Sequence, residues 1–196
     1  MSSGLRELVA NSVMRLRSRA PFFSVLALHS EWIADPNIGT AATDGSRILF
    51  APAFIQGLTS DQRDGLVAHE ACHIALRHVA RCGEYDPVRW NVAADIVVNG
   101  MVTAMGLKLP PGAIRDQELE HLSVEEVYWR LSHPPESHRR KLGARIGHKG
   151  RDLMPHQSSD TQQTVAESAH WQDVVRKAMV LQRMHDQRAG TNSMNA

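Results

Sequence analysis

The strongest constraint on this chain is an apolar stretch that contains two histidines and a glutamate. Residues 69–73 read His-Glu-x-x-His, and the rest of the run from Leu66 to Leu76 is apolar. Residues four apart lie on the same face of a helix, so His69 and His73 can direct their imidazoles at one point. Burying these groups without a partner is costly. The pattern therefore predicts a buried helix whose polar face meets a metal ion or, alternatively, hydrogen-bonded groups of the core.

Zinc is the metal that suits this pattern. It binds its ligands tetrahedrally and accepts imidazole nitrogens, so we predict His69 and His73 as metal ligands. Glu70 lies about 100° round the helix, within reach of a zinc-bound water for which it would act as general base. Zinc lowers the pKa of that water towards neutral, and the glutamate would take its proton as the water attacks a carbonyl. The alternative is a pair of hydrogen-bonded core histidines.

Local signals place the motif on a helix and predict a second helix after it. Thr59 and Gln62 form a capping box, and a glycine follows residue 82, so the pattern predicts one helix over 59–82. The second helix is predicted over 86–106, because Asp86 is a cap residue and a proline follows it.

The second predicted helix carries a single polar stripe on an otherwise apolar surface. Its members are spaced four apart: Asn91, Asp95, Asn99 and Thr103. Asp95 is the only ionisable member, and a buried carboxylate needs a cation. We therefore predict Asp95 as the third metal ligand, with Asn91 and Asn99 orienting it or its neighbours. In the alternative, Asp95 is a cap or pairs with Arg77 or Arg81.

Two residues near the motif have other predicted roles. His78 lies five residues after His73, which is one short of the spacing in a metzincin, and the glycine of that pattern is missing. We expect His78 beside the metal ligands or at the surface, not as a ligand. Cys72 faces away from the two histidines and is expected to pack in the core.

The remaining segments predict an α+β fold in which helices dominate. The expected elements are an amphipathic helix near 5–16, a strand at 22–28, a hairpin of 38–43 with 47–50 around Asp44-Gly45, a helix over 124–131 and an amphipathic helix from 171 to 182. We expect three parts: a domain at 1–132, a basic and polar linker or loop at 133–166, and a C-terminal helix at 167–188 that docks on the domain.

Composition excludes several classes of function. There are 22 basic and 21 acidic residues, and only 5% aromatics, which argues against nucleic acid as the main partner. Two cysteines exclude a disulfide scaffold. The chain has no apolar run of about 18 residues and no visible secretory signal, so we expect a cytoplasmic protein without a membrane span. The basic run 138–151 is expected to be a solvated loop, or else a contact for an acidic partner or nucleic acid.

Four segments taken together resemble a known family. They run from Leu66 to His78, from Asp86 to Asn99, from Gly106 to Gly112 and from Leu122 to Tyr128. They are similar to the metallopeptidase domain that usually precedes a von Willebrand factor A-like domain in bacterial and phage proteins. The resemblance covers about residues 5–131. It implies a zincin-type zinc peptidase with an active-site helix, a small sheet with an edge strand, and a second ligand-bearing helix.

The resemblance also carries expectations about the ligand and the partner. Thermolysin-like enzymes place a glutamate ligand directly after an asparagine, but Val92 follows Asn91 here, so the ligand would be Asp95, as in aspartate-type zincins. Because family members often continue into the A-like domain, a von Willebrand factor A-like protein is an expected partner.

Two further parts of a peptidase site have candidates in the sequence. In zincins an edge strand pairs with an extended substrate, and Arg47–Phe50 is either that strand or one that only packs the sheet. A hydrogen-bond donor opposite Glu70 would stabilise the transition state. The candidates for this donor are Tyr128, His121 and Arg77.

These observations lead to one main hypothesis. We expect a zinc-dependent metallopeptidase that acts on a peptide or protein, with His69, His73 and Asp95 holding Zn²⁺ and Glu70 activating the water. Two alternatives remain. One is a non-catalytic, zinc-containing binding module in a larger assembly, and the other is a zinc hydrolase of a non-peptide bond.

Overall fold

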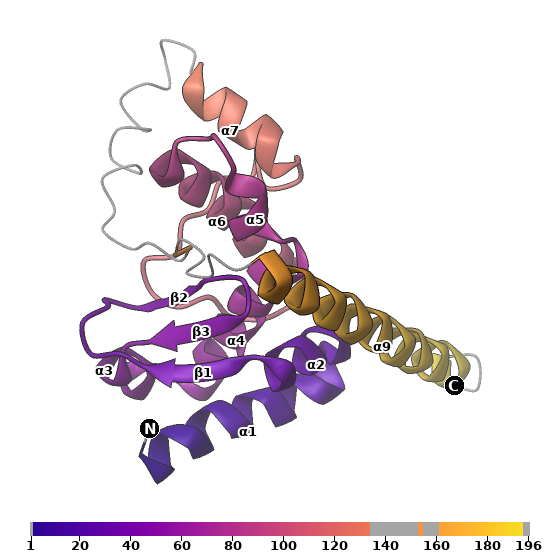
Figure 1. Cartoon of the computed structure of the whole chain (residues 1–196). Coiled ribbons are helices and arrows are strands. Elements are labelled where there is room, and N and C mark those ends of the chain that lie inside the picture. Colours follow the sequence, from indigo (N-terminus) through magenta and orange to yellow (C-terminus); the bar gives the residue numbers. More distant parts are fainter. Residues whose placement is uncertain (1, 134–152, 155–160, 194–196) are drawn as a thin grey trace.

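Helices dominate the fold and surround one small sheet (Figure 1). The computed structural model describes residues 2–133, 153–154 and 161–193. Within these ranges the sheet has three strands in the order β1-β3-β2. The predicted α+β class with dominant helices is confirmed.

Two helices open the chain. α1 spans Ser3–Arg19 and buries one apolar face, as predicted. α2 spans Pro21–His29, so the prediction of a strand at 22–28 is wrong. A short apolar run does not distinguish a strand from a buried helix, and the proline at the first helical position favours the helix. α2 packs against α1, α4 and α9, which explains why its sequence lacks a polar stripe.

The sheet contains the predicted hairpin and one strand that the sequence did not predict. β2 (Ala41–Thr43) and β3 (Arg47–Phe50) pair antiparallel. In the turn, Oδ1 of Asp44 accepts the backbone N–H of Arg47 at 2.8 Å. β1 (Glu31–Ala34) pairs parallel with the other side of β3. Of the two alternatives for Arg47–Phe50, the edge strand is therefore wrong, because β3 is central and β1 and β2 form the edges.

The helix of the motif begins where predicted but ends earlier. After the short helix α3 (Pro52–Gly57), α4 spans Ser60–Ala75, and the capping box at its start is confirmed. Arg77 then adopts a left-handed conformation with φ of 53°. A new helix, α5 (His78–Cys82), follows it. The predicted single helix over 59–82 is thus two helices joined by a sharp turn.

The next two helices agree with the sequence. α6 spans Pro87–Ala104, and the side chain of Asp86 accepts the N–H of Arg89 as its cap. α7 spans Val124–Ser132 behind the predicted capping box of Ser123. Both helices lie at one end of the molecule, and their facing apolar side chains form a core cluster around the buried Trp90.

The last helix, α9 (Thr161–Ser193), starts six residues earlier than predicted and also extends past residue 188. It therefore includes the end of the segment expected to be a linker. The rest of that segment, with its basic run, lies mostly outside the described residues, and the division at 132 and 166 stays a prediction. α9 lies along α2, where the side chain of Gln182 accepts the N–H of Phe22 at 3.2 Å. Figure 1 shows this long helix at one side of the molecule.

The larger core cluster joins α1, α2, α4, the sheet and α9. α4 lies in the middle of this cluster and also packs against α6, so the motif is held at the junction of the two clusters. Among the helices of the described ranges, none combines the length and apolar character needed to cross a bilayer.

A close backbone approach at Gly65 leads to the first prediction. A Cβ on Gly65 would lie 1.9 Å from the carbonyl oxygen of Lys108, so the chain after α6 crosses α4 where only glycine leaves space. We expect Gly65→Ala to lower the free energy of unfolding by about 1–3 kcal/mol or more, as overpacked sites do. Urea denaturation measures this loss.

Gly57→Ala is the matched control, because nothing lies within 4 Å of a Cβ at that position. Equal unfolding free energies for the two variants would contradict the close approach.

Candidate metal centre

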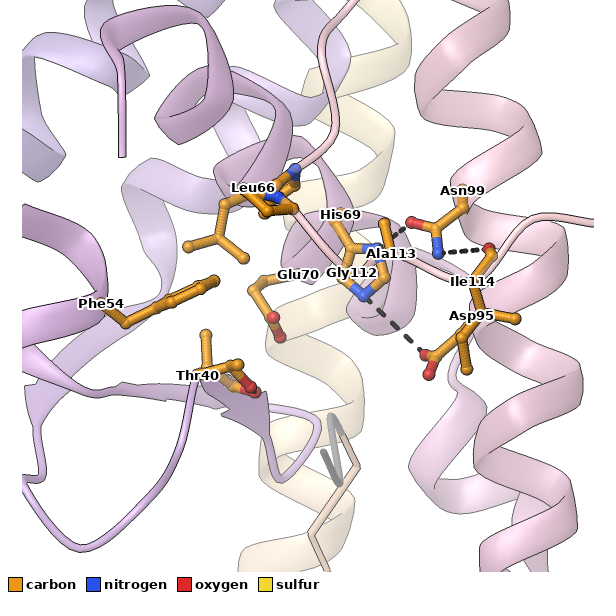
Figure 2. A pocket seen from close by; sticks show the side chains of 13 residues that line it. Thr40, Phe54, Leu66, His69, Glu70, Asp95, Asn99, Gly112, Ala113 and Ile114 are labelled. Atoms are coloured by element: carbon orange, nitrogen blue, oxygen red, sulfur yellow. Dashed lines mark hydrogen bonds and ion pairs between the residues drawn. The ribbon is translucent and has the colours of Figure 1, made fainter. Parts of the chain in front are cut away.

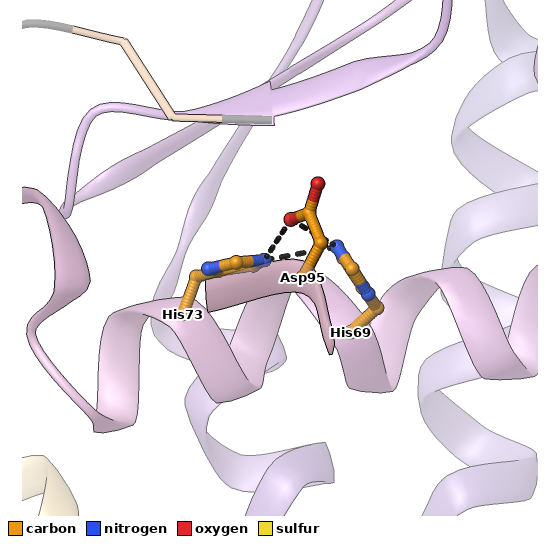
Figure 3. Close-up of side chains that lie close together, drawn as sticks. All are labelled: His69, His73 and Asp95. Atoms are coloured by element: carbon orange, nitrogen blue, oxygen red, sulfur yellow. Dashed lines mark hydrogen bonds and ion pairs between the residues drawn. The ribbon is translucent and has the colours of Figure 1, made fainter. Parts of the chain in front are cut away.

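Two helices bring the three predicted ligands to one place. α4 carries His69 and His73 one turn apart, and α6 packs beside it with Asp95 facing them (Figure 3). One ligand atom from each residue lies within 4.8 Å of the others. All three side chains are buried, with relative exposures of 5%, 0% and 4%.

The distances show how closely the ligand atoms converge. Nε2 of His73 lies 2.9 Å from Nε2 of His69. Oδ1 of Asp95 is 3.3 Å from Nε2 of His73 and 3.9 Å from Nε2 of His69. This group of two imidazole nitrogens and one carboxylate oxygen is rich in electron pairs and is buried, so a cation at its centre would stabilise it.

Asn99 fixes the orientation and tautomer of His69. Its Nδ2 donates to the carbonyl of Ile114 at 2.9 Å, which leaves Oδ1 to face Nδ1 of His69 at 2.9 Å. An amide oxygen only accepts, so Nδ1 of His69 carries the proton. Nε2 of a neutral His69 therefore presents its lone pair to Asp95 and His73. The predicted orienting role of Asn99 agrees with these contacts.

His78 lies directly behind His73. Their Nδ1 atoms are 3.0 Å apart, so one ring donates to the other. The turn at Arg77 directs His78 inward, and its side chain is 1% exposed. Burial, together with His69 and His78, lowers the pKa of His73 well below its usual value. The ring of His73 is thus neutral near pH 7, which is the form that binds a metal.

Asn91 supports the carboxylate of Asp95 from the adjacent turn of α6. Its Nδ2 donates to Oδ2 of Asp95 at 2.9 Å, which leaves Oδ1 of Asp95 as the oxygen nearest the histidines. The alternative pairing of Asp95 with Arg81 does not occur, because Arg81 binds Glu125 at 2.6 Å. Arg77, the other alternative, is exposed.

Glu70, His69 and Asp95 border a cavity of about 290 Å³ (Figure 2). The Glu70 side chain is fully buried and points toward Thr40, at the start of β2. The remaining lining is mostly apolar: Ala41, Phe54, Leu66, Pro110, Pro111, Gly112, Ala113 and Ile114. A substrate group placed in this cavity would therefore touch the polar side chains of His69, Glu70 and Asp95 as well as apolar carbon.

Other predicted residues lie away from the cavity. The hydroxyl of Tyr128 accepts the backbone N–H of Asp86 at 3.1 Å, and its ring packs near Trp90. His121 and Arg77 are exposed. None of the three proposed transition-state donors lines the cavity. Cys72 packs in the larger core cluster as predicted, and burial raises the pKa of its thiol.

Sequence reasoning missed the apolar wall of the cavity. Phe54 comes from α3, and the segment 110–114 follows α6, so neither is near the motif along the chain. One signal was present. Gly65 interrupts a helix just before the motif, and an isolated glycine in a helix often marks close approach of another backbone. Here that backbone is Lys108, which leads into the wall.

Comparison with known protein families agrees with this geometry. A family model described as "Putative metallopeptidase domain" matches residues 7–194. The chain belongs to this family. The match extends beyond the four segments of the sequence resemblance and includes all of α9. No curated protein and no solved structure matches this metallopeptidase-family domain.

The Asn99 contact leads to a prediction about metal affinity. Removing the group that orients a histidine ligand typically weakens metal binding 10–100-fold. We expect Asn99→Ala to weaken zinc binding by about this factor, because Nδ1 of His69 loses its acceptor. Competition with a chromophoric chelator measures the affinity.

The exposed Asn37→Ala is the control and should bind zinc as the unchanged chain does. Equal affinities for the two variants would contradict the orienting role of Asn99.

The burial of His78 leads to a prediction about pH. Burial, Arg81 and His69 lower the pKa of His78 to about 3. As the pH falls below about 6.5, the unfolded chain takes up a proton that the folded chain does not, so stability falls with pH. With chelator present, the free energy of unfolding should fall between pH 7.5 and pH 5 in both chains. We expect the fall to be about 2 kcal/mol smaller in His78→Gln than in the unchanged chain.

Urea denaturation at the two pH values measures this difference. His121→Gln, at an exposed position, should behave as the unchanged chain does. If the stability of His78→Gln and of His121→Gln depends on pH in the same way, His78 does not contribute to the loss of stability at low pH.

Proposed function

We propose that the chain is a zinc-dependent metallopeptidase that hydrolyses peptide bonds in a peptide or protein substrate. The observation that carries the proposal is the convergence of His69, His73 and Asp95. Two of them, His69 and Asp95, line one cavity together with Glu70. Membership of the metallopeptidase family supports the same activity. On the earlier resemblance and composition alone, we also propose a cytoplasmic location and a von Willebrand factor A-like partner.

The donor set suits zinc. Two imidazole nitrogens and one carboxylate oxygen are ligands of catalytic zinc, and three protein ligands leave a fourth position open. His69 and His73 would bind through Nε2, and Asp95 through Oδ1. When bound, zinc supplies a Lewis acid that polarises a carbonyl and lowers the pKa of water.

Glu70 is the proposed general base. It follows His69 on α4, is buried, and lines the cavity beside the ligand residues. Its carboxylate would accept a proton from the attacking water and then donate that proton to the nitrogen of the leaving amine. The apolar wall would exclude other water from this transfer, which strengthens the electrostatic interactions within the site.

The cavity also supports a preference in the substrate. Phe54, Leu66 and Ile114 line the same cavity as His69, Glu70 and Asp95. We propose that they receive an apolar side chain next to the bond that is cleaved, because apolar lining favours apolar groups. Thr40 and Ala41 belong to the same cavity, so the substrate backbone would run along β2, not along β3 as the sequence suggested.

Replacing Glu70 tests the proposed chemistry. We expect Glu70→Gln to keep its zinc and its fold but to lose about 10²–10⁴-fold in kcat/KM, the range typical of a lost general base. The measurement combines metal analysis with cleavage of a fluorogenic peptide library, in parallel with small ester and amide substrates.

Glu118→Gln, at an exposed position, is the control and should keep full activity. If the zinc-loaded protein cleaves none of these substrates, the result favours a non-catalytic binding module over an enzyme. Cleavage of esters but not peptides would favour a hydrolase of a non-peptide bond.

A further inference from the structure

A second segment of this chain lies against the outer edge of β2. Leu153 forms a parallel β-bridge with Thr43, and the N–H of Met154 donates to the carbonyl of Thr43 at 2.8 Å. Figure 1 shows these two residues as a short coloured segment next to β2. The contact joins residues more than a hundred positions apart, so it is tertiary and not part of a local turn.

The same segment is anchored to the second ligand-bearing helix. The N–H of Leu153 donates to Oδ1 of Asn91 at 2.9 Å, while Nδ2 of Asn91 donates to Asp95. The Leu153 side chain packs against the core cluster of α6 and α7. Two backbone N–H groups and one apolar side chain thus hold the segment between β2 and α6.

This position continues the groove in which the substrate is proposed to lie. Thr40 and Ala41 line the cavity, and Thr43 is two residues further along β2, or about 7 Å at the usual rise of a strand. A peptide that extends from the cavity along this edge would reach Thr43 within two or three residues. Its backbone would then need the carbonyl that Met154 already binds.

The sequence also favours an extended backbone in this segment. Pro155 follows Met154, and a residue before proline is restricted to extended backbone. Peptides that add to a sheet edge bind in this way, through main-chain hydrogen bonds with pockets for alternate side chains.

We propose that the Thr43 carbonyl and the Asn91 side chain form a binding site for the backbone of an extended peptide, and that Leu153–Met154 occupies it as an internal ligand that competes with substrate. The competition with substrate rests on the proposed peptidase function. The binding site itself does not, because it is defined by the two hydrogen bonds and the apolar contact of the segment.

The test uses a pair of variants at one position in the full chain. Met154→Pro removes the N–H that binds Thr43, whereas Met154→Ala keeps it. The probe is a fluorescent peptide with the sequence of residues 148–157, His-Lys-Gly-Arg-Asp-Leu-Met-Pro-His-Gln. We expect it to bind Met154→Pro about fivefold more tightly than Met154→Ala, the factor for one net backbone hydrogen bond. Fluorescence anisotropy measures both affinities.

Two controls make the result specific. The same peptide with proline in place of methionine lacks the N–H and should bind Met154→Pro about fivefold more weakly than the original peptide. Leu153→Ala keeps both N–H groups but loses the apolar contact, so it should also bind the probe more tightly than the unchanged chain. If circular dichroism shows that Met154→Pro does not fold, the affinity of Leu153→Ala for the probe tests the proposal instead. Equal affinity for the probe in the folded variants and the unchanged chain would overturn the proposal.

Peptide cleavage separates this proposal from the proposed function. With zinc added, we expect Met154→Pro to have a lower KM than Met154→Ala at a similar kcat. If all chains cleave peptides with the same KM, the internal ligand is wrong and the peptidase stands. If no chain cleaves any peptide but the probe binds Met154→Pro more tightly, the peptidase is wrong and the peptide-binding site stands.

Discussion

The structure depends on the burial of two imidazoles and a carboxylate between two apolar helices. His69, His73 and Asp95 lie in the interior, where an isolated charge or an unsatisfied polar group is expensive. The chain meets this cost with neighbouring polar side chains: Asn99 binds His69, His78 binds His73, and Asn91 binds Asp95. Each contact orients a ligand atom toward the same point. The cluster is therefore held in place by the packing of α4 against α6 and by polar side chains from α5 and α6.

These supporting contacts also connect the cluster to the rest of the site. Asn99 reaches from His69 to the carbonyl of Ile114, so the residue that sets the tautomer also holds the apolar wall. The wall follows from the crossing at Gly65, where the backbone of Lys108 touches α4. The candidate metal-binding cluster, the shape of the cavity and the path of the chain after α6 are thus linked through a few residues. A change at one of them would alter both the cluster and the space of the cavity.

The edge of β2 connects the site to a distant part of the chain. Asn91 makes both contacts, because one end of its amide binds Asp95 and the other binds Leu153. A peptide that replaced Leu153 would have to offer an N–H to the same oxygen. The segment at the edge and the Asp95 carboxylate thus share one side chain, which under the two proposals would connect peptide binding to the candidate metal ligands.

The elements whose signals are local could be predicted from the amino-acid sequence. The capping boxes at Thr59 and Ser123, the Asp44-Gly45 turn and the four-residue spacing of Asn91, Asp95 and Asn99 depend on residues a few positions apart, and they predicted the helices, the hairpin and the ligand cluster. Tertiary structure alone decided the rest. The apolar run after Pro21 became a helix because it is covered on several sides, and β3 became central because β1 pairs with it. The cavity wall and the Leu153 contact join residues far apart in the chain, and no local pattern encodes a pairing whose energy comes from packing and backbone hydrogen bonds formed only after folding.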